Sequence, residues 1–265
     1  GFQNNLPGRI SSFLNDELKI GNFYFGFILL TLSFIYYILK SKKFFLIFLI
    51  FFIFVSFIIG ERSNFIKVFI MILLFTFLFE KKYFKLKVLL FSAFFLVAVL
   101  FINFNSNFKE RFFEQMYKPV LDDPALYFSN LRYIQHYKTA IRIYDNNKIF
   151  GIGLKNYRIE SGKKVYQDLQ TSTHPHQVHF EFLSELGIAG YLSLIMFFIY
   201  HFYKYKKNKL YNDNLNLAGL LFVITSLLPL LPAGSFFTSN GATLFWMNFA
   251  LMTLNQKKIN YEFFK

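Results

Sequence analysis

A histidine-rich stretch joins a polar segment to an apolar one in the second half of the chain. It covers residues 171–190 and reads TSTHPHQVHFEFLSELGIAG. Imidazole is the side chain whose protonation changes near neutral pH, so paired histidines at such a junction are candidates for a general base. The candidates are His174 and His176, with Gln177 beside them.

The local sequence predicts that a helix starts within this stretch. Proline is favoured at the first helical position, because its missing N–H would have no partner there. Pro175 in that position makes Thr173 or His174 the N-cap, places His176 in the first turn, and lets the Gln177 side chain reach back. The dipole and the free N–H groups of that turn attract phosphate and favour a neutral imidazole.

Two other interpretations of the histidines stay open. They are equally compatible with polar residues that simply face water at a membrane surface. A metal site with His174, His176 and His179 as ligands is the weaker alternative, because the chain has 0 Cys and no acidic cluster at ligand spacing. We therefore predict neither a metal nor another cofactor.

The composition indicates a membrane protein. Hydrophobic residues make up 55% of the 265 residues, and 41 of them are Phe, which is more apolar than a soluble domain. Most of the seven apolar runs have roughly 15 to 18 residues, enough to cross a thin hydrocarbon core as a helix. The runs cover residues 22–39, 44–60, 65–79, 86–102, 188–203, 217–233 and 242–254.

The placement of the lysines predicts the orientation. Lysines cluster in alternate loops, which the positive-inside rule assigns to the cytoplasm. They are Lys40, Lys42, Lys43, Lys81, Lys82, Lys85, Lys87, Lys204, Lys206, Lys207, Lys209, Lys257, Lys258 and Lys265. Seven crossings then leave the N-terminus outside and the C-terminus inside. The net charge of +14 is explained by the lysines of the cytoplasmic loops, so it does not indicate a nucleic-acid partner.

The predicted fold class is all-α: a polytopic membrane protein with about seven transmembrane helices and a long, partly helical outer loop. Transmembrane helices are expected in residues 1–102, the loop in 103–186, and further transmembrane helices with a cytoplasmic tail in 187–265. The start on Gly1, without a signal-peptide pattern, suggests a fragment whose earlier spans are missing.

Two cations break the lysine pattern. Arg62 sits in a short outer turn, and Lys67 lies about one turn deeper in the span. Guanidinium suits phosphate through paired N–H donors, although a turn in which Glu61 merely neutralises Arg62 would also explain it. Lys67 either snorkels toward water or adds positive potential near Arg62.

The outer loop contains a predicted amphipathic helix from Leu131 to Tyr144, capped by Ser129 or Asn130. Its apolar stripe is Leu131, Ile134, Tyr137, Ile141 and Tyr144, and Arg132, Gln135, His136, Thr139 and Arg142 lie off it. Arg132 opposes the dipole of the first turn, so either a binding role or a plain solvated face explains it. Gly151 and Gly153 further on are a weak sign of a phosphate loop.

These motifs together resemble the O-antigen ligase and polymerase family. The segments that carry the resemblance are HPHQ at 174–177, then Phe180, Glu181, Glu185 and GIAG at 187–190, FGIGLKNY at 150–157, GERS at 60–63 and GRISSF at 8–13. The resemblance extends from Gly8 to Leu254. Departures are Gln177 in place of Asn, and Glu61 and Asn64 beside Arg62 in place of Ser and Gly.

The resemblance implies a multi-pass glycosyltransferase of the GT-C type in a bacterial inner membrane, with its active site facing the periplasm. Its partners would be a polyprenyl diphosphate-linked glycan donor, membrane lipid, and lipid A-core (ligase) or a growing glycan (polymerase) as acceptor. Arg62 would hold the diphosphate and His176 would activate the acceptor hydroxyl. Expected substrate contacts are Arg9, Lys67, Arg132, His174 and Gln177. A transporter or flippase for a lipid-linked glycan and a passive membrane scaffold are the alternatives from other classes.

Overall fold

The computed structural model describes residues 8–10, 20–39, 41–79, 82–166, 168–169 and 172–254. Within these ranges the secondary structure is helical and contains no β-strand, which confirms the all-α class. The helices are α1 (Ile20–Ile38), α2 (Lys42–Ile59), α3 (Arg62–Phe79), α4 (Phe84–Phe104), α5 (Ser106–Phe108), the π-helix η2 (Lys109–Tyr117), α6 (Lys118–Asp122), α7 (Pro124–Asn130), α8 (Arg132–Asn146), α9 (Tyr157–Glu160), η3 (Lys164–Tyr166), α10 (Val178–Lys207), η4 (Leu210–Asn212), α11 (Asn214–Ser226) and α12 (Ser239–Thr253).

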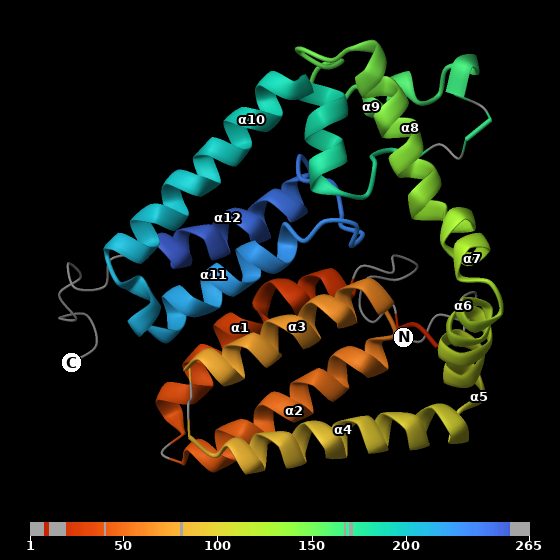
Figure 1. Ribbon diagram of the computed structural model, residues 1–265. Coiled ribbons are helices and arrows are strands. Elements are labelled where there is room, and N and C mark those ends of the chain that lie inside the picture. The colour runs from red at the N-terminus through yellow and green to blue at the C-terminus, as the bar shows by residue number, and fades with distance from the viewer. Residues whose placement is uncertain are drawn as a thin grey trace.

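The long helices form two groups that lie side by side (Figure 1). In the first group α1 packs against α2 and α3, and α2 packs against α4. In the second group α11 packs against α12 and also contacts α1 and α3, so it joins the two groups. The segment α5 to α8 runs across one end of the long helices, and α8 packs on α10.

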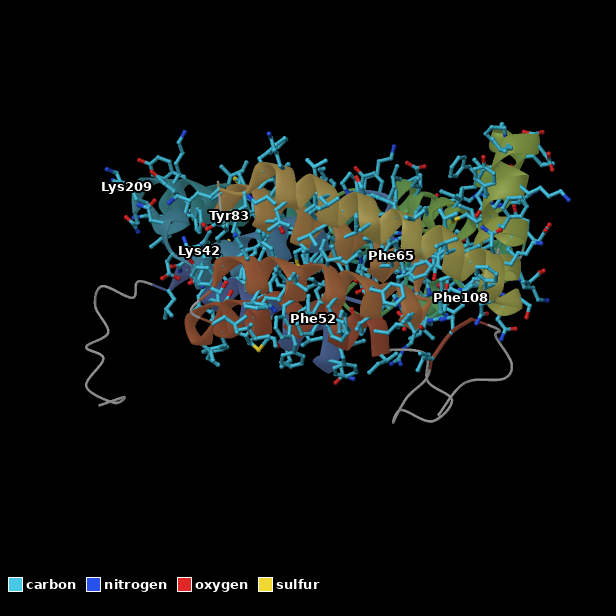
Figure 2. All side chains as sticks on the ribbon, turned by 90° about the horizontal axis from the view of Figure 1, so that it is seen from below. Lys42, Phe52, Phe65, Tyr83, Phe108 and Lys209 are labelled. Atoms are coloured by element: carbon cyan, nitrogen blue, oxygen red, sulfur yellow. The ribbon has the colours of Figure 1, made fainter. Side chains whose placement is uncertain are left out.

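Every predicted apolar run overlaps a helix, and all but the sixth are helical over nearly their whole length. By length and composition, α2, α4 and α10 are long and apolar enough to cross a membrane, while α11 and residues 20–36 of α1 are shorter apolar helices. Lys42 and Lys209 lie at the same end of the molecule, and Phe108 lies at the other (Figure 2). The chain is therefore a membrane protein by its apolar helices, with lysine-rich loops gathered at one end.

The sixth apolar run is only partly helical. It extends to Ala233 in sequence, but α11 ends at Ser226. Pro229 and Pro232 cannot donate the backbone hydrogen bond that a longer helix would require. The chain instead continues as an irregular segment in which Leu230 adopts a φ of 66°.

The loop helix exists as predicted, over slightly different residues, but its cap was predicted wrongly. α8 begins at Arg132, and its N-cap, Leu131, makes no side-chain capping bond. Ser129 was a predicted cap, but its hydroxyl donates to Leu126 O at 3.0 Å, within the preceding α7. The additional helix α7 thus uses the residue that sequence analysis assigned to α8.

The buried face of α8 also differs from the predicted stripe. His136 and Thr139 are 2% and 0% exposed, whereas Ile141 is 43% exposed. The reason is the partner surface: Tyr157 and Tyr166 pack under α8, and the Tyr157 hydroxyl donates to the His136 carbonyl at 3.2 Å. A surface with hydroxyl groups accepts polar side chains that an apolar core would exclude.

Gly187 breaks α10 near its start. Its φ of 63° and ψ of −168° are not helical, and a Cβ there would lie 2.3 Å from the Ile149 carbonyl oxygen. Ile188 N donates to Lys148 O at 2.8 Å, which holds this loop against the break. The helix therefore has a short first part, which begins just after His174 and His176 in the sequence, and a long second part that runs in another direction (Figure 1).

We expect Gly187→Ala to destabilise the protein. The positive φ alone costs roughly 1–3 kcal/mol for a non-glycine residue, and the steric contact with Ile149 adds to it. The midpoint of thermal unfolding of the purified protein should fall clearly below that of wild type. Gly162→Ala is the control, because its nearest neighbouring atom lies 3.5 Å from the added Cβ. Equal midpoints for the two variants would contradict the role of the break.

Candidate active site

The helix start at the histidine stretch lies further along the chain than predicted. The N-cap of α10 is Gln177, whose side-chain oxygen accepts from His179 N at 2.7 Å and from Phe180 N at 3.3 Å. Pro175 precedes the helix, and His176 has a left-handed backbone with a φ of 58°. The prediction of Pro175 as the first helical residue is wrong, because the amide of Gln177 supplies the cap.

Three imidazole rings gather beside this helix start. The ring centroids of His174 and His176 are 4.0 Å apart, and that of His136 lies 5.3 Å from His176. His136 comes from α8 and is buried. Sequence analysis missed its role because it placed His136 on the solvated face of the helix.

Burial keeps His174 and His176 neutral. It lowers the pKa of His174 to about 4 and that of His176 to about 3, and repulsion between the rings, including His136, acts in the same direction. A backbone hydrogen bond with Ala233 opposes the shift in both residues. The neutral form is favoured as predicted, but the main cause is desolvation and not the helix dipole.

His179 is turned away from the other rings. Its Nε2 lies 2.9 Å from Leu227 O, and its Nδ1 lies 3.2 Å from the Tyr191 hydroxyl. The three-histidine ligand set considered above is therefore not assembled. Over the described residues, no group of three or more His, Cys, Asp and Glu side chains could hold a metal ion.

A second cluster lies around the start of α3, and we call it the positive cluster. It consists of the guanidinium groups of Arg9, Arg62 and Arg111. Glu61 is buried and pairs with Arg9 at 3.4 Å rather than with Arg62. It also accepts from Asn64 Nδ2 at 2.6 Å. In the described part of the chain no carboxylate pairs with Arg62, whose Nη1 contacts the Arg111 carbonyl at 3.5 Å. Neutralisation by Glu61 therefore does not explain Arg62.

Arg111 belongs to this cluster and was missed. Its Nε donates to Gly60 O at 2.7 Å, and the residue is 9% exposed. Burial lowers the pKa of Arg111 to about 10, helped by the positive charges of Arg62 and Arg9, so the Arg111 guanidinium group remains charged at neutral pH. No sequence motif marks Arg111, although its π-helix is a conformation often found at functional sites.

Tyr133 links the two clusters. Its ring centroid is 5.4 Å from that of His176, and its phenol is close enough to act electrostatically on Arg111. The neighbouring Arg132 is exposed and contributes a little to the low pKa of His176. The first turn of α8 thus brings the positive cluster and the neutral histidines to one region.

A family model described as O-antigen ligase matches residues 44–195, which is more than half of the chain. The chain belongs to the O-antigen ligase family. A search of curated proteins and a search of solved structures found no match. Membership makes this a membrane glycosyltransferase of the O-antigen ligase and polymerase type. The matched range contains Arg62 and Arg111 as well as the histidine cluster.

In this O-antigen ligase family member, Lys67 points into the protein. It is 2% exposed, its Nζ donates to Pro232 O at 2.7 Å, and it lies 5.6 Å from the centre of the Phe25 ring. Of the two alternatives for Lys67, outward snorkelling is wrong, because its ammonium group donates a hydrogen bond to a backbone carbonyl inside the protein. Gln177 is also buried and serves as the cap described above.

The FGIGLKNY turn binds protein backbone. Ile152 N donates to Ser184 O at 3.1 Å, and Gly153 N donates to Glu185 O at 2.8 Å. The Glu185 carboxylate accepts from Lys155 N at 2.6 Å. These N–H groups are occupied, so the turn is not a phosphate loop, and its glycines instead allow close contact with the break in α10.

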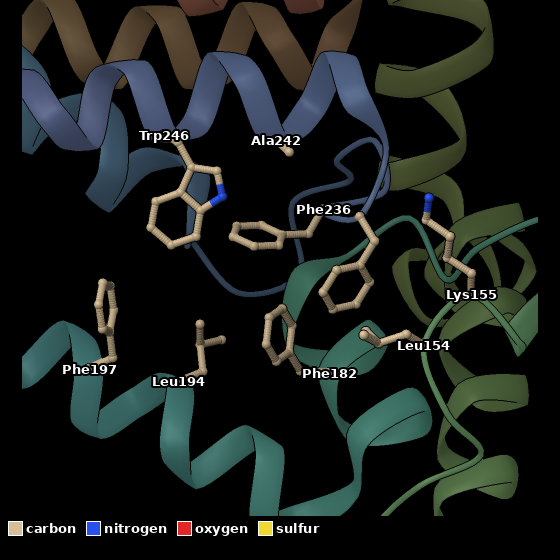
Figure 3. Close-up of a pocket in the computed structure, with 9 residues that line it drawn as sticks. Leu154, Lys155, Phe182, Leu194, Phe197, Phe236, Ala242 and Trp246 are labelled. Carbon is tan, nitrogen blue, oxygen red and sulfur yellow. The ribbon is translucent and has the colours of Figure 1, made fainter.

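An apolar pocket of about 470 Å³ opens between α10 and α12. Phe182, Phe197, Phe236 and Trp246 surround it, and Lys155 lies at one end (Figure 3). Aromatic and aliphatic walls with one cation at the rim suit an apolar chain that carries an anionic head.

The histidine pair predicts a pH-dependent stability. Between pH 6.5 and roughly pH 4, the unfolded chain binds protons at these imidazoles that the folded chain does not bind, so stability falls as pH is lowered. Above pH 6.5 the pair contributes no slope. We expect the unfolding midpoint to drop less between pH 7.5 and 5 in His176→Gln than in wild type. Parallel curves for the two proteins would show that burial does not hold this ring neutral.

Proposed function

We propose that the chain is an O-antigen ligase that transfers a glycan from a polyprenyl diphosphate carrier to a hydroxyl of lipid A-core. The proposal rests above all on one observation: Tyr133 packs beside His176, in the neutral histidine cluster, and acts electrostatically on Arg111, in the positive cluster. A polymerase that uses a growing glycan as acceptor would share this donor chemistry.

The positive cluster is the proposed diphosphate site. Breaking the bond between a sugar and a diphosphate develops negative charge on the leaving group, which fixed guanidinium groups stabilise. Arg62 is half-buried, has no carboxylate partner in the described chain, and donates from Nη1 to the Arg111 carbonyl. Its other N–H donors are the ones proposed to bind an anion. Arg111 and Arg9 add positive charge behind it, and the exposed Arg132 is a further contact.

His176 is the proposed general base. The acceptor oxygen forms a bond to the sugar carbon, the bond from that carbon to the diphosphate breaks, and the hydroxyl proton passes to the imidazole. A ring with a pKa of about 3 is unprotonated at neutral pH, so it can accept a proton, but it is a weak base. A bound diphosphate raises that pKa because a nearby negative charge favours the imidazolium. The His174 ring packs against this ring, with their centroids 4.0 Å apart.

The proposed setting is the bacterial inner membrane, with both clusters on the periplasmic side. Lys42 and Lys209 lie at the opposite end of the helices from Phe108 (Figure 2), in agreement with a cytoplasmic lysine-rich end. Seven crossings would divide the chain into transmembrane helices in 1–102, a periplasmic loop in 103–186, and transmembrane helices with a tail in 187–265. The apolar pocket beside α10 would take the hydrocarbon part of a lipid-linked substrate.

We expect Arg62→Ala and His176→Ala to lower glycan transfer at least about 100-fold, the range for removal of an electrostatic or acid–base group. The assay combines purified protein, a polyprenyl diphosphate-linked glycan and lipid A-core. Arg142→Ala is the matched control, because Arg142 makes an exposed ion pair with Asp168 at 2.8 Å on the far part of α8. Wild-type rates in either site variant would remove that residue from the mechanism.

The products of the same assay distinguish the candidate functions. Glycan attached to lipid A-core supports a ligase. Longer carrier-linked glycan with unmodified lipid A-core indicates a polymerase. Movement of the carrier across vesicle membranes without any transfer would instead support a transporter.

The proposed orientation predicts which side of the membrane each loop faces. The chain has 0 Cys, so a single introduced cysteine reports its own location. Lys138→Cys, exposed on α8, should react with a membrane-impermeant maleimide in intact spheroplasts. Lys209→Cys, exposed in the loop before η4, should react only after permeabilisation. Labelling of Lys209→Cys in intact spheroplasts would overturn the proposed orientation.

A further inference from the structure

The segment between α11 and α12 has no helix of its own, yet hydrogen bonds from several elements hold it. We call residues 227–236 the strap. On one side it accepts from the Gln177 amide at Leu228 O, 3.4 Å, and from the Tyr137 hydroxyl at Leu230 O, 3.3 Å. Irregular backbone that is held at so many points is positioned and not loose.

One contact ties the strap to the helix that begins at Arg62. Lys67 on α3 donates from its buried Nζ to Pro232 O at 2.7 Å. An ammonium group at a carbonyl in a water-poor site makes a strong, charge-assisted bond. The strap therefore has a fixed relation to the helix that carries the proposed diphosphate-binding residue.

The next residues tie the strap to the histidine stretch. Ala233 N donates to His176 O at 2.7 Å. Two residues later Ser235 Oγ donates to one oxygen of Glu181, and Phe236 N donates to the other at 2.7 Å. Glu181 is 1% exposed, so its carboxyl group forms hydrogen bonds with the strap and not with solvent. His176 has a left-handed backbone, which persists only where surrounding contacts determine it.

We infer that Glu181 and Lys67 are positioning residues that fix His176 relative to Arg62 through the strap. The inference rests on the proposed function, in which these two residues act on acceptor and donor. Glu181 holds Ser235 and Phe236, the strap holds the His176 backbone through Ala233, and Lys67 anchors the same strap to α3. Neither residue touches substrate in this scheme.

The test compares Glu181→Ala with Glu181→Gln in the full chain. Loss of the side chain should lower kcat at least about tenfold, since small misplacements of a catalytic group have effects up to about 100-fold, while the donor KM stays within about threefold. Gln keeps an acceptor oxygen for Phe236 N and should restore most of kcat. Equal inactivity of the Gln and Ala variants would overturn positioning in favour of direct proton transfer by Glu181. Wild-type kcat in Glu181→Ala would also overturn it.

A milder variant and a second readout guard against misfolding and separate this inference from the proposed function. Ser235→Ala removes one bond to Glu181 and should lower kcat severalfold. Ser193→Ala, whose hydroxyl bonds only within α10 at 2.8 Å, is the control. Peptide-resolved labelling of His176 by diethyl pyrocarbonate, measured without substrates, should be severalfold faster in Glu181→Ala and in Lys67→Met. Faster labelling in a protein without transferase activity would reject the proposed function and keep the positioning role. Unchanged labelling would overturn the positioning role whatever the transferase activity.

Discussion

Backbone N–H and C=O groups that are buried outside a helix must form hydrogen bonds with other protein groups, because neither lipid nor apolar side chains can bind them. This requirement shapes the end of the molecule that carries the candidate site. Glu185 binds the N–H groups of the FGIGLKNY turn, Glu181 binds those of the strap, and Lys67 binds a strap carbonyl. Buried charges here are thus hydrogen-bonding partners of irregular backbone, and the site depends on them for its shape.

The fold could be predicted from sequence as far as hydrophobic run lengths determine it. Each apolar run contains a helix, because a helix satisfies its own backbone hydrogen bonds in an apolar setting. The errors lie at helix ends. Pro175 was placed at the first helical position by local preference, but the start of α10 depends on Gln177, which caps it. The sixth run was extended past Pro229 and Pro232, which end the helix, and distant partners hold the segment that follows.

The candidate site was predicted less completely. His174 and His176 could be found because they sit together in the sequence, and Arg62 could be found because it breaks the lysine pattern. Arg111, Tyr133 and His136 have no such signal, since tertiary packing brings Arg111 to Gly60 and brings Tyr133 and His136 to His176. The hydrophobic stripe of α8 did not predict the buried face of the helix. Such a stripe identifies the buried face when the partner surface is apolar, whereas tyrosines lie beneath α8.

The basicity of the histidine cluster depends on burial and on nearby positive charge. Burial lowers the pKa of His176 so far that the free protein holds a neutral but weakly basic ring. The positive charge of Arg132 acts in the same direction. On the proposed mechanism, a diphosphate that pairs with Arg62 and Arg132 would add negative charge near the imidazole, which raises its proton affinity. Donor binding would then create the base that the acceptor needs, so that proton removal from the acceptor would be effective only after the donor is in place.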